Sequence, residues 1–357
     1  MHKMEQRQLY KFVFSLQSFD KQREDDARHL QLQNLAMQGL NGHKLKVPPR
    51  PHLFSDPKFE ISLVEHLERE HLEYVLSQTH PVMLSSLPSK KYFVVNAALS
   101  LPHVGEKDPN DADLDWHDPQ LRRFWNVATA RYLIDVLQHV VVCANIAMPG
   151  GLHLHTGFLY LDGQHRQLRM GNIDMWHPVD RTAEIGWPTF ATLDFDAVWQ
   201  WYLKQNGTLA GFSDGPLSRA VAALSHLFSE STDTTGMRDL MWSLAGLEGL
   251  FGGSRAPSIS ELCEKSFALL GGPANEQLVR KQIKEMYNFR SRLIHGQRNL
   301  ASHVRREEMH SYSKFDSRHA EENNTIGLSV AILLAAVQKC AEDNRMSLPF
   351  KYKIGDG

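Results

Sequence analysis

The spacing of apolar side chains divides the chain into a mixed first half and a helical second half. From about residue 194, apolar residues recur every three or four positions, which is typical of amphipathic helices. Gly252-Gly253, Gly271-Gly272-Pro273 and Gly296 interrupt this pattern, as helix-ending residues do. We therefore expect an antiparallel bundle with short connections, with helices over 194–205, 216–229, 236–251, 258–270, 275–295, 303–321 and 325–342.

The first half carries shorter and more varied patterns. Residues 1–40 are polar and rich in glutamine, and we expect one or two helices there and another over 58–79. Pro48, Pro49 and Pro51 indicate a linker. Runs rich in β-branched or aromatic residues predict strands at 92–98 and 140–147, with a helix over 121–138 between them. The dipeptide Asp162-Gly163 favours a hairpin between 153–161 and 165–173.

These patterns predict an α+β protein in which a mixed α/β N-terminal domain is followed by an all-α bundle. We expect a helical and polar N-terminal segment over 1–50, a mixed domain over 51–193 and the bundle over 194–345. The longest apolar run, near 326–337, is too short to span a bilayer. It predicts a buried bundle helix, and we expect no membrane partner.

Composition narrows the class of protein but does not identify a function. Apolar residues make up 42% of the chain and the formal net charge is −2, as in ordinary globular proteins. The three cysteines, Cys143, Cys263 and Cys340, form no CxxC motif and indicate no disulfide framework. Because the N-terminal residues also lack the apolar core of a secretory signal, we expect a cytoplasmic location.

Two charged residues lie at positions where their helices should be apolar. At about 100° per residue, Arg290 falls near the centre of the stripe formed by Val279, Ile283, Met286, Leu293 and Ile294. Glu248 falls within the stripe formed by Met237, Leu240, Met241, Leu244 and Phe251. Buried charges are costly unless they are paired, so we predict a partly buried ion pair. Such a pair either only fixes helix register or supports a functional site.

His295 and the basic residues around it add to this pattern. Gly296 is a typical residue just beyond a helix end, so His295 should lie in the last turn, where the helix dipole favours a cation. Residues 280–306 contain eight basic residues and one acid, a local excess of seven positive charges in a chain of net −2. This segment is either a phosphate-binding surface or a solvated basic face whose charge is balanced elsewhere in space.

The residues around this pair resemble a known family. Arg290-Ser-Arg-Leu-Ile-His295 fits the R-x4-6-H signature of HEPN domains. Together with Leu240-Met-Trp-Ser-Leu-Ala-Gly-Leu-Glu-Gly-Leu-Phe251 and the flanking Tyr287-Asn-Phe and Gly296, it is similar to the Apea-like HEPN family over roughly 236–342. The resemblance implies an all-α bundle that often dimerises. For many members it also implies metal-independent RNA cleavage without a cofactor, commonly in antiphage defence or toxin systems.

Carried over to this chain, the resemblance makes Arg290 and His295 the catalytic pair. Ser291 stands where active HEPN ribonucleases often have Asn, Asp or His. We expect Glu248, Ser291 and Tyr287 to support the pair. RNA contacts are expected from Arg292, Arg298 and Lys284.

The spacing of the pair predicts an oligomeric site. Five residues on a straight helix correspond to about 140° of rotation and roughly 7.5 Å of rise, so one helix does not direct both side chains at one small site. We expect a homodimer with a composite cleft that cleaves RNA, with tRNA as one candidate. The N-terminal half would bind a trigger ligand or protein. The alternative is a non-catalytic HEPN scaffold that dimerises and binds RNA or protein.

Two other groups of residues resemble metal sites. His153 and His155 alternate on a predicted strand and share a face, but spacing supplies no third ligand, so two surface histidines are the preferred interpretation. Asp111, Asp113 and Asp115 resemble the start of a calcium loop, but Trp116 and Arg122 stand where glycine and glutamate are required. A solvated acidic loop is the better interpretation, and we expect no metal.

Overall fold

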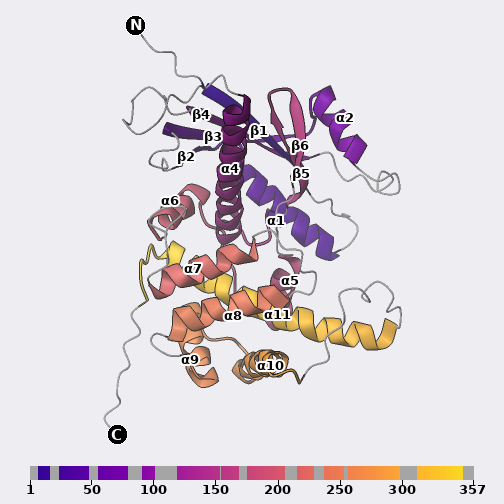
Figure 1. Cartoon of the computed structure of the whole chain (residues 1–357). Helices are drawn as coiled ribbons and strands as arrows, with labels where there is room; N and C mark the ends of the chain where they lie inside the picture. The colour runs from indigo at the N-terminus through magenta and orange to yellow at the C-terminus, as the bar shows by residue number, and fades with distance from the viewer. Residues whose placement is uncertain are drawn as a thin grey trace. The chain divides into compact units, whose positions relative to one another are not determined.

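The computed structural model describes residues 7–16, 24–47, 55–78, 91–100, 119–152, 154–168, 175–205, 215–228, 237–252, 256–297 and 312–348 (Figure 1). Contacts divide the chain into two compact units, one of residues 1–141 with 151–170 and one of residues 142–150 with 171–357. The described residues 7–16 and 24–47 belong to the first of these units. The second unit takes in residues from 171 onward.

The first unit is built on a six-stranded sheet in the order β2-β3-β4-β1-β5-β6, and each neighbouring pair is antiparallel. This sheet, with the helices, confirms the α+β class. The strands are β1 (Arg7–Leu16), β2 (Lys44–Lys46), β3 (Ser55–Val64), β4 (Tyr92–Ser100), β5 (Leu154–Leu161) and β6 (Gln164–Leu168). The helices of this part of the chain are α1 (Glu24–Leu40), α2 (Arg69–Gln78) and α4 (Pro119–Ala147).

Of the one or two helices expected in residues 1–40, α1 is present, whereas residues 7–16 form a strand, β1. Tyr10, Phe12, Phe14 and Leu16 alternate along it and are each at most 1% exposed. Its partners are β4 on one edge and β5 on the other, and on its opposite face Val13 is also buried. The helix expected over 58–79 is also only half right. Residues 55–64 form β3, where buried Phe59 and Ile61 alternate with polar neighbours, and only α2 is helical.

The predicted hairpin is confirmed, but one predicted strand is a helix. Asp162 and Gly163 have φ values of 50° and 74° and join β5 to β6, as a tight two-residue hairpin turn requires. Residues 140–147 belong to the end of α4, where every residue is buried. Because burial on all sides favours apolar residues in any secondary structure, this β-branched run did not distinguish a strand from a core helix.

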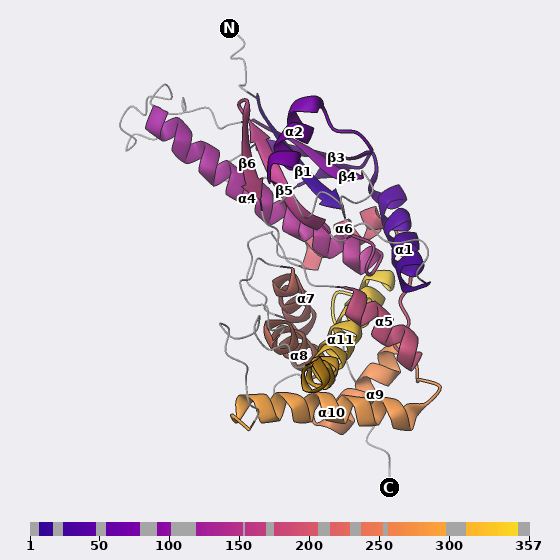
Figure 2. The same ribbon diagram turned by 90° about the vertical axis from the view of Figure 1, so that its right-hand side faces the viewer.

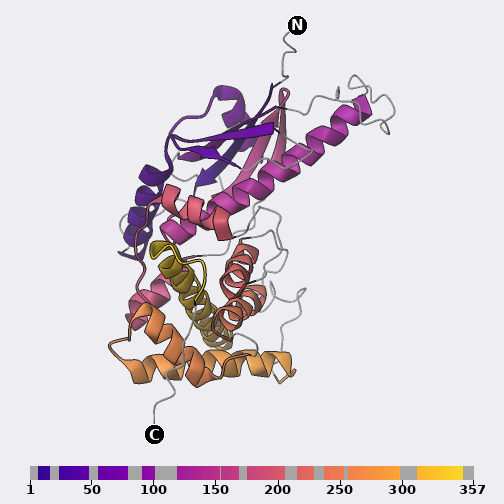
Figure 3. The same cartoon turned by 90° about the vertical axis from the view of Figure 1, so that its left-hand side faces the viewer.

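Helices cover the sheet. Helix α2 packs through Tyr74 and Val75 on the face that carries Val13, Val94 and Phe158. The opposite face of β1 carries Phe12 and Phe14, which are fully buried. Figure 2 shows α4 running obliquely along the sheet, and the same crossing is seen from the other side in Figure 3.

The second unit is a helical bundle centred on one long helix, α11 (Tyr312–Glu342), which contacts all the other helices of the bundle. The surrounding helices are α5 (Trp176–Ile185), α6 (Phe195–Gln205), α7 (Pro216–Leu227), α8 (Met237–Gly252), α9 (Ile259–Leu270) and α10 (Glu276–Ile294). The predicted helices from 194 to 295 are confirmed. The two predicted over 303–321 and 325–342 are corrected, since 312–342 is one continuous helix, and α5 was not predicted.

Two helical segments of the described chain, Asn126–Ala147 and Ala320–Glu342, are long and apolar enough to cross a membrane by length and composition. Most of each segment is buried inside the protein, as in core helices, so they are weak evidence for a span. The apolar run at 328–337 is buried within the bundle, as the sequence predicted.

Candidate functional site

Helix α10 has well-defined ends that position the candidate residues. Asn275 caps its start, where the side-chain Oδ1 accepts a hydrogen bond from the Leu278 N–H at 3.0 Å. At its end, Gly296 has a φ of 67°, and Gly296 and Gln297 donate to the carbonyls of Leu293 and Arg292. This is a Schellman motif, and it confirms Gly296 as the residue just beyond the helix end.

The predicted ion pair between α8 and α10 is present. Arg290 Nη1 lies 3.0 Å from Glu248 Oε1, with the two side chains 30% and 19% exposed. The buried face of α10 consists of Val279, Ile283, Met286 and Phe289, so Arg290 lies at its edge. A partly buried guanidinium is costly unless an acid is paired with it, and Glu248 is that acid.

Two members of the predicted apolar stripes lie elsewhere than expected. Ile294 is 51% exposed at the end of α10, and Met241 is 38% exposed on α8. Phe289 and Leu247 are buried in the stripes of α10 and α8 instead.

Tyr287 belongs to the same group of residues. Its hydroxyl is buried, and within the described residues neither this hydroxyl nor Nε of Arg290 has a hydrogen-bond partner. Burial, followed by the negative charge of Glu248, raises the pKa of Tyr287 far above its ordinary value. The phenol therefore stays neutral and remains a potential hydrogen-bond donor beside the ion pair.

His295 lies apart from this ion pair on the helix. It is the exposed C-cap residue of α10, and its backbone N–H donates to the Ser291 carbonyl at 3.0 Å. The five residues from Arg290 to His295 therefore follow nearly regular helical geometry up to the end of α10. Among the described residues of one chain, the imidazole of His295 makes no hydrogen bond or ion pair with Arg290 or Glu248.

The basic segment is largely neutralised in space. Arg280 pairs with Glu276 at 2.7 Å, Lys281 lies 3.8 Å from Glu285, and Arg292 pairs with Glu321 at 2.7 Å. With Arg290 held by Glu248, Lys284 is the one basic residue of 280–297 with no ion pair among the described residues. Arg298 lies outside the described residues. The excess of positive charge read from the sequence is therefore smaller on the folded surface.

A polar cleft lies beside α10. Its cavity volume is about 760 Å³, and α5, α10 and α11 line it. Ser291 and Arg292, both singled out from the sequence, line this cleft, but Arg290 does not. Residues two positions apart in a helix point in directions that differ by about 200°. Arg292 therefore lies on the other side of α10 from Arg290.

Sequence reasoning missed a cluster of titratable residues in the first unit. His71 of α2 is 1% exposed, and its Nδ1 lies 2.9 Å from Nε2 of His165 on β6. On the other side of the ring, Nε2 lies 3.3 Å from Nζ of Lys11, which also bonds Glu68 at 2.7 Å. Tyr74 stacks on His165 with ring centroids 4.4 Å apart. The contacts of Lys11 with Glu68 and of His71 with His165 join residues 57 and 94 positions apart, so no local motif could have indicated the cluster.

The donors fix the direction of these hydrogen bonds. The ammonium of Lys11 can only donate, so His71 Nε2 accepts, and Nδ1 carries the proton donated to His165. Burial first, and then the charge of Lys11, lower the pKa of His71. Ligand atoms of Glu68, Glu70 and His71 lie within 4.8 Å of one another, as in a metal site. The Lys11 ammonium already lies among them as the cation, so we assign the cluster a structural role.

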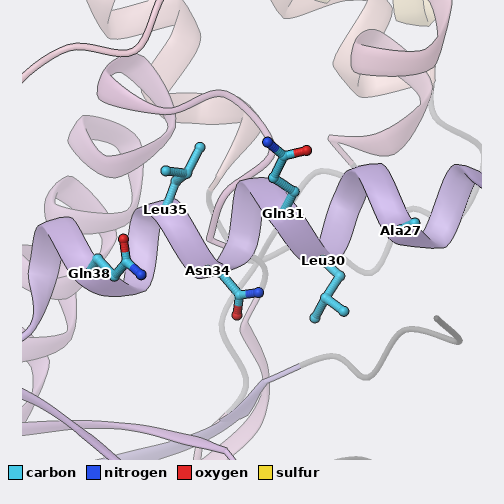
Figure 4. A pocket seen from close by; sticks show the side chains of 6 residues that line it. All are labelled: Ala27, Leu30, Gln31, Asn34, Leu35 and Gln38. Carbon is cyan, nitrogen blue, oxygen red and sulfur yellow. The ribbon is translucent and has the colours of Figure 1, made fainter.

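The remaining candidates carry less chemistry. A shallow hollow of about 460 Å³ lies along α1 (Figure 4), where Gln31 and Leu35 point to one side of the helix and Leu30 and Asn34 to the other. Because these side chains diverge and none of the lining residues is titratable, the hollow has no convergent polar groups. His153, the side chain of His155 and Asp111–Asp115 lie outside the described residues.

Comparison of the chain with protein-family models, with curated proteins and with solved structures finds no match of any of the three kinds. The resemblance to HEPN domains therefore depends on the residues quoted above.

Proposed function

We propose that the chain is a metal-independent endoribonuclease of the HEPN type, with Arg290 and His295 as its catalytic pair, and that it acts as a defence or toxin effector. The main support is the environment of Arg290. Glu248 holds its guanidinium at 3.0 Å while 30% of the side chain stays exposed at the end of a helix that presents His295 to solvent. A positioned guanidinium stabilises phosphate oxygens in a transition state.

The proposed reaction needs no metal because the nucleophile is supplied by the RNA. His295 would move the proton of the 2′-hydroxyl or protonate the leaving 5′-oxygen. Arg290 would stabilise the negative charge that develops on the phosphorane-like transition state. The 2′-oxygen attacks phosphorus as the bond to the 5′-oxygen breaks, which leaves a 2′,3′-cyclic phosphate and a free 5′-hydroxyl. DNA lacks the 2′-hydroxyl and would not be cleaved.

The site is proposed to form between two copies of the chain. Arg290 and His295 face different sides of α10, so a two-fold axis near the helix end would bring one copy's Arg290 to its partner's His295. Exposed Ile294 lies next to His295 and supplies apolar area for such a contact. The buried donors of Tyr287 and Arg290 that lack partners among the described residues also fit a site completed by a second chain.

The test is incubation of total RNA and of tRNA with the full chain, with product ends mapped. Arg290→Lys and His295→Ala should each lower cleavage by about 10²-fold or more, and EDTA should not. Gln277→Ala, an exposed position in the first turn of α10, is the matched control. Relief of expression toxicity by His295→Ala would support the same conclusion. Full activity of His295→Ala, or strict dependence on magnesium, would contradict the mechanism.

A non-catalytic scaffold is the second candidate. It is favoured by the fact that Glu248 already neutralises Arg290, as a purely structural pair requires. A scaffold would bind RNA or protein with no new RNA ends. Dimerisation that persists in His295→Ala, together with no cleavage by the wild type, would favour it.

A further inference from the structure

The polar cleft beside α10 has the dimensions of a ligand site. Its volume of about 760 Å³ lies within the range of small-molecule sites, about 300–1,000 Å³. Unlike most such sites, it is lined almost entirely by polar side chains, with Leu328 as its apolar member. Its ligand must therefore be recognised chiefly by hydrogen bonds.

The charges in the cleft are already balanced. Arg292 pairs with Glu321 at 2.7 Å. Arg181 of α5 is 13% exposed, pairs with Glu184 at 2.7 Å and donates to the side-chain oxygen of Gln282. Because each guanidinium is already paired with a carboxylate, neither is a ready partner for a phosphate. The charge balance favours a neutral ligand that is rich in donors and acceptors.

Several hydrogen-bonding groups of the cleft remain open. Asn288, Ser291 and Asn324 are exposed, and within the described residues their side chains have no hydrogen-bond partners. Nε of Arg181 is buried and also has no partner there. A carboxamide presents a donor and an acceptor side by side, which matches the edge of a nucleobase.

The cleft also lies next to the proposed catalytic histidine. Ser291, which lines the cleft, is one helical turn before His295, and Gln297, which also lines it, follows two residues later. A sugar–phosphate group at His295 would therefore have its base close to this cleft.

We propose that the cleft between α5, α10 and α11 binds one unpaired base of a single-stranded RNA and sets the base preference of the enzyme, an inference that rests on the proposed function. Asn288 and Asn324 read the edge of the base, and Arg181 and Arg292 shape the walls. The flanking phosphates stay outside the cleft, where Lys284 is available.

The test measures binding separately from cleavage. The full chain is titrated with short 2′-O-methyl homopolymers of A, C, G and U, which cannot undergo 2′-hydroxyl attack. We expect one base to bind about tenfold more tightly than the weakest, as one bidentate contact provides. The double variant Asn288→Ala/Asn324→Ala should reduce this preference to less than about twofold. Gln277→Ala, on the same helix outside the cleft, should keep it.

Three results would overturn the proposal. They are equal binding of all four homopolymers by the wild type, no binding of any, and a base preference that the double variant retains. Its failure is distinguishable from failure of the catalytic proposal. If unmodified RNA is cleaved and the double variant keeps the base preference, the cleft proposal is wrong and the catalytic proposal stands. If the double variant loses the base preference but the wild type does not cleave unmodified RNA, the catalytic proposal is wrong and base binding in the cleft stands.

Discussion

Arg290 of α10 and Glu248 of α8 form an ion pair of 3.0 Å in which both side chains are largely withdrawn from water. Replacing Glu248 leaves the charged guanidinium of Arg290 partly buried without the carboxylate that balances it. Glu248→Ala should therefore lower the free energy of unfolding by about 1–3 kcal/mol, the range for loss of a partner of a half-buried charged group. Urea denaturation of the variant and the wild type measures this difference.

The exposed pair Arg292–Glu321 is the matched control for the first prediction. Its side chains are 47% and 45% exposed, so its coupling energy should stay within about 1 kcal/mol. Double-mutant cycles on both pairs should give the larger coupling for Arg290–Glu248. Equal couplings would show that partial burial of Arg290 has no energetic consequence.

Gly296 should tolerate alanine poorly because its φ is 67°. Alanine in this left-handed conformation costs about 1–2 kcal/mol, and the helix end that holds His295 should fray. Gly296→Asn should recover part of the loss, since asparagine accepts this conformation. The measurement is chemical denaturation, with Gly272→Ala as the control because no atom lies within 4 Å of its added Cβ and its φ is not positive. Equal stabilities of the two alanine variants would be inconsistent with a Schellman end.

Gly157 should be among the least replaceable residues of the sheet. It pairs with Phe14 across β1 and β5, and a Cβ built on it would lie 2.2 Å from Phe14 Cδ1 and 2.5 Å from the Val13 carbonyl oxygen. Gly157→Ala must force the two strands apart, so stability should fall by about 1–3 kcal/mol or more.

Hydrogen exchange of the β1 amides should report this separation directly. Gly163→Ala is the control, because its added Cβ meets no atom within 4 Å. Its only cost in stability is the strain of a φ of 74°. A smaller loss at Gly157 than at Gly163 would refute the close approach of β1 and β5.

Stability of the first unit should fall as the pH is lowered below about 6.5, the ordinary pKa of histidine. Burial and Lys11 lower the pKa of His71 in the folded protein, so below this pH the unfolded chain binds a proton that the folded chain does not. Above it both states are neutral at His71 and the contribution is constant. The groups facing this ring are Lys11, Glu68, Glu70, Tyr160 and His165.

Urea denaturation between about pH 5 and pH 8 checks this dependence. His71→Gln should flatten the decline near pH 6, with His66→Gln at an exposed position as the control. An unchanged pH profile in His71→Gln would assign the decline to other groups.

Local signals predicted those elements that depend on local chemistry. Gly296 ends α10, and Asp162-Gly163 turns the β5–β6 hairpin. Each is determined by hydrogen bonds or dihedral angles within a few residues. The helical wheel likewise predicted the Arg290–Glu248 pair, because a charge in an apolar stripe requires a partner.

Elements determined by distant contacts were not predictable in this way. Strand β1 lies in a polar, glutamine-rich stretch, and its pairing residues on β5 are almost 150 positions away. The end of α4 contains the β-branched residues of a strand, but burial on every side makes it a core helix. The His71–His165 contact and the polar cleft join segments that have no common local pattern. The net charge of residues 280–306 likewise did not indicate that Arg280, Lys281 and Arg292 pair with acids in the folded protein.

The position of β1 in the middle of the sheet has a consequence for how the chain acquires its structure. This strand is synthesised before both of its neighbours, and its β5 partner, Leu154–Leu161, emerges from the ribosome long after it. Until then only β4 is present to pair with β1, and the other edge of β1 stays unpaired, which is the situation that recruits chaperones and promotes aggregation. Such long-range pairing also raises the contact order, so the sheet should form late and slowly compared with the helices of the bundle.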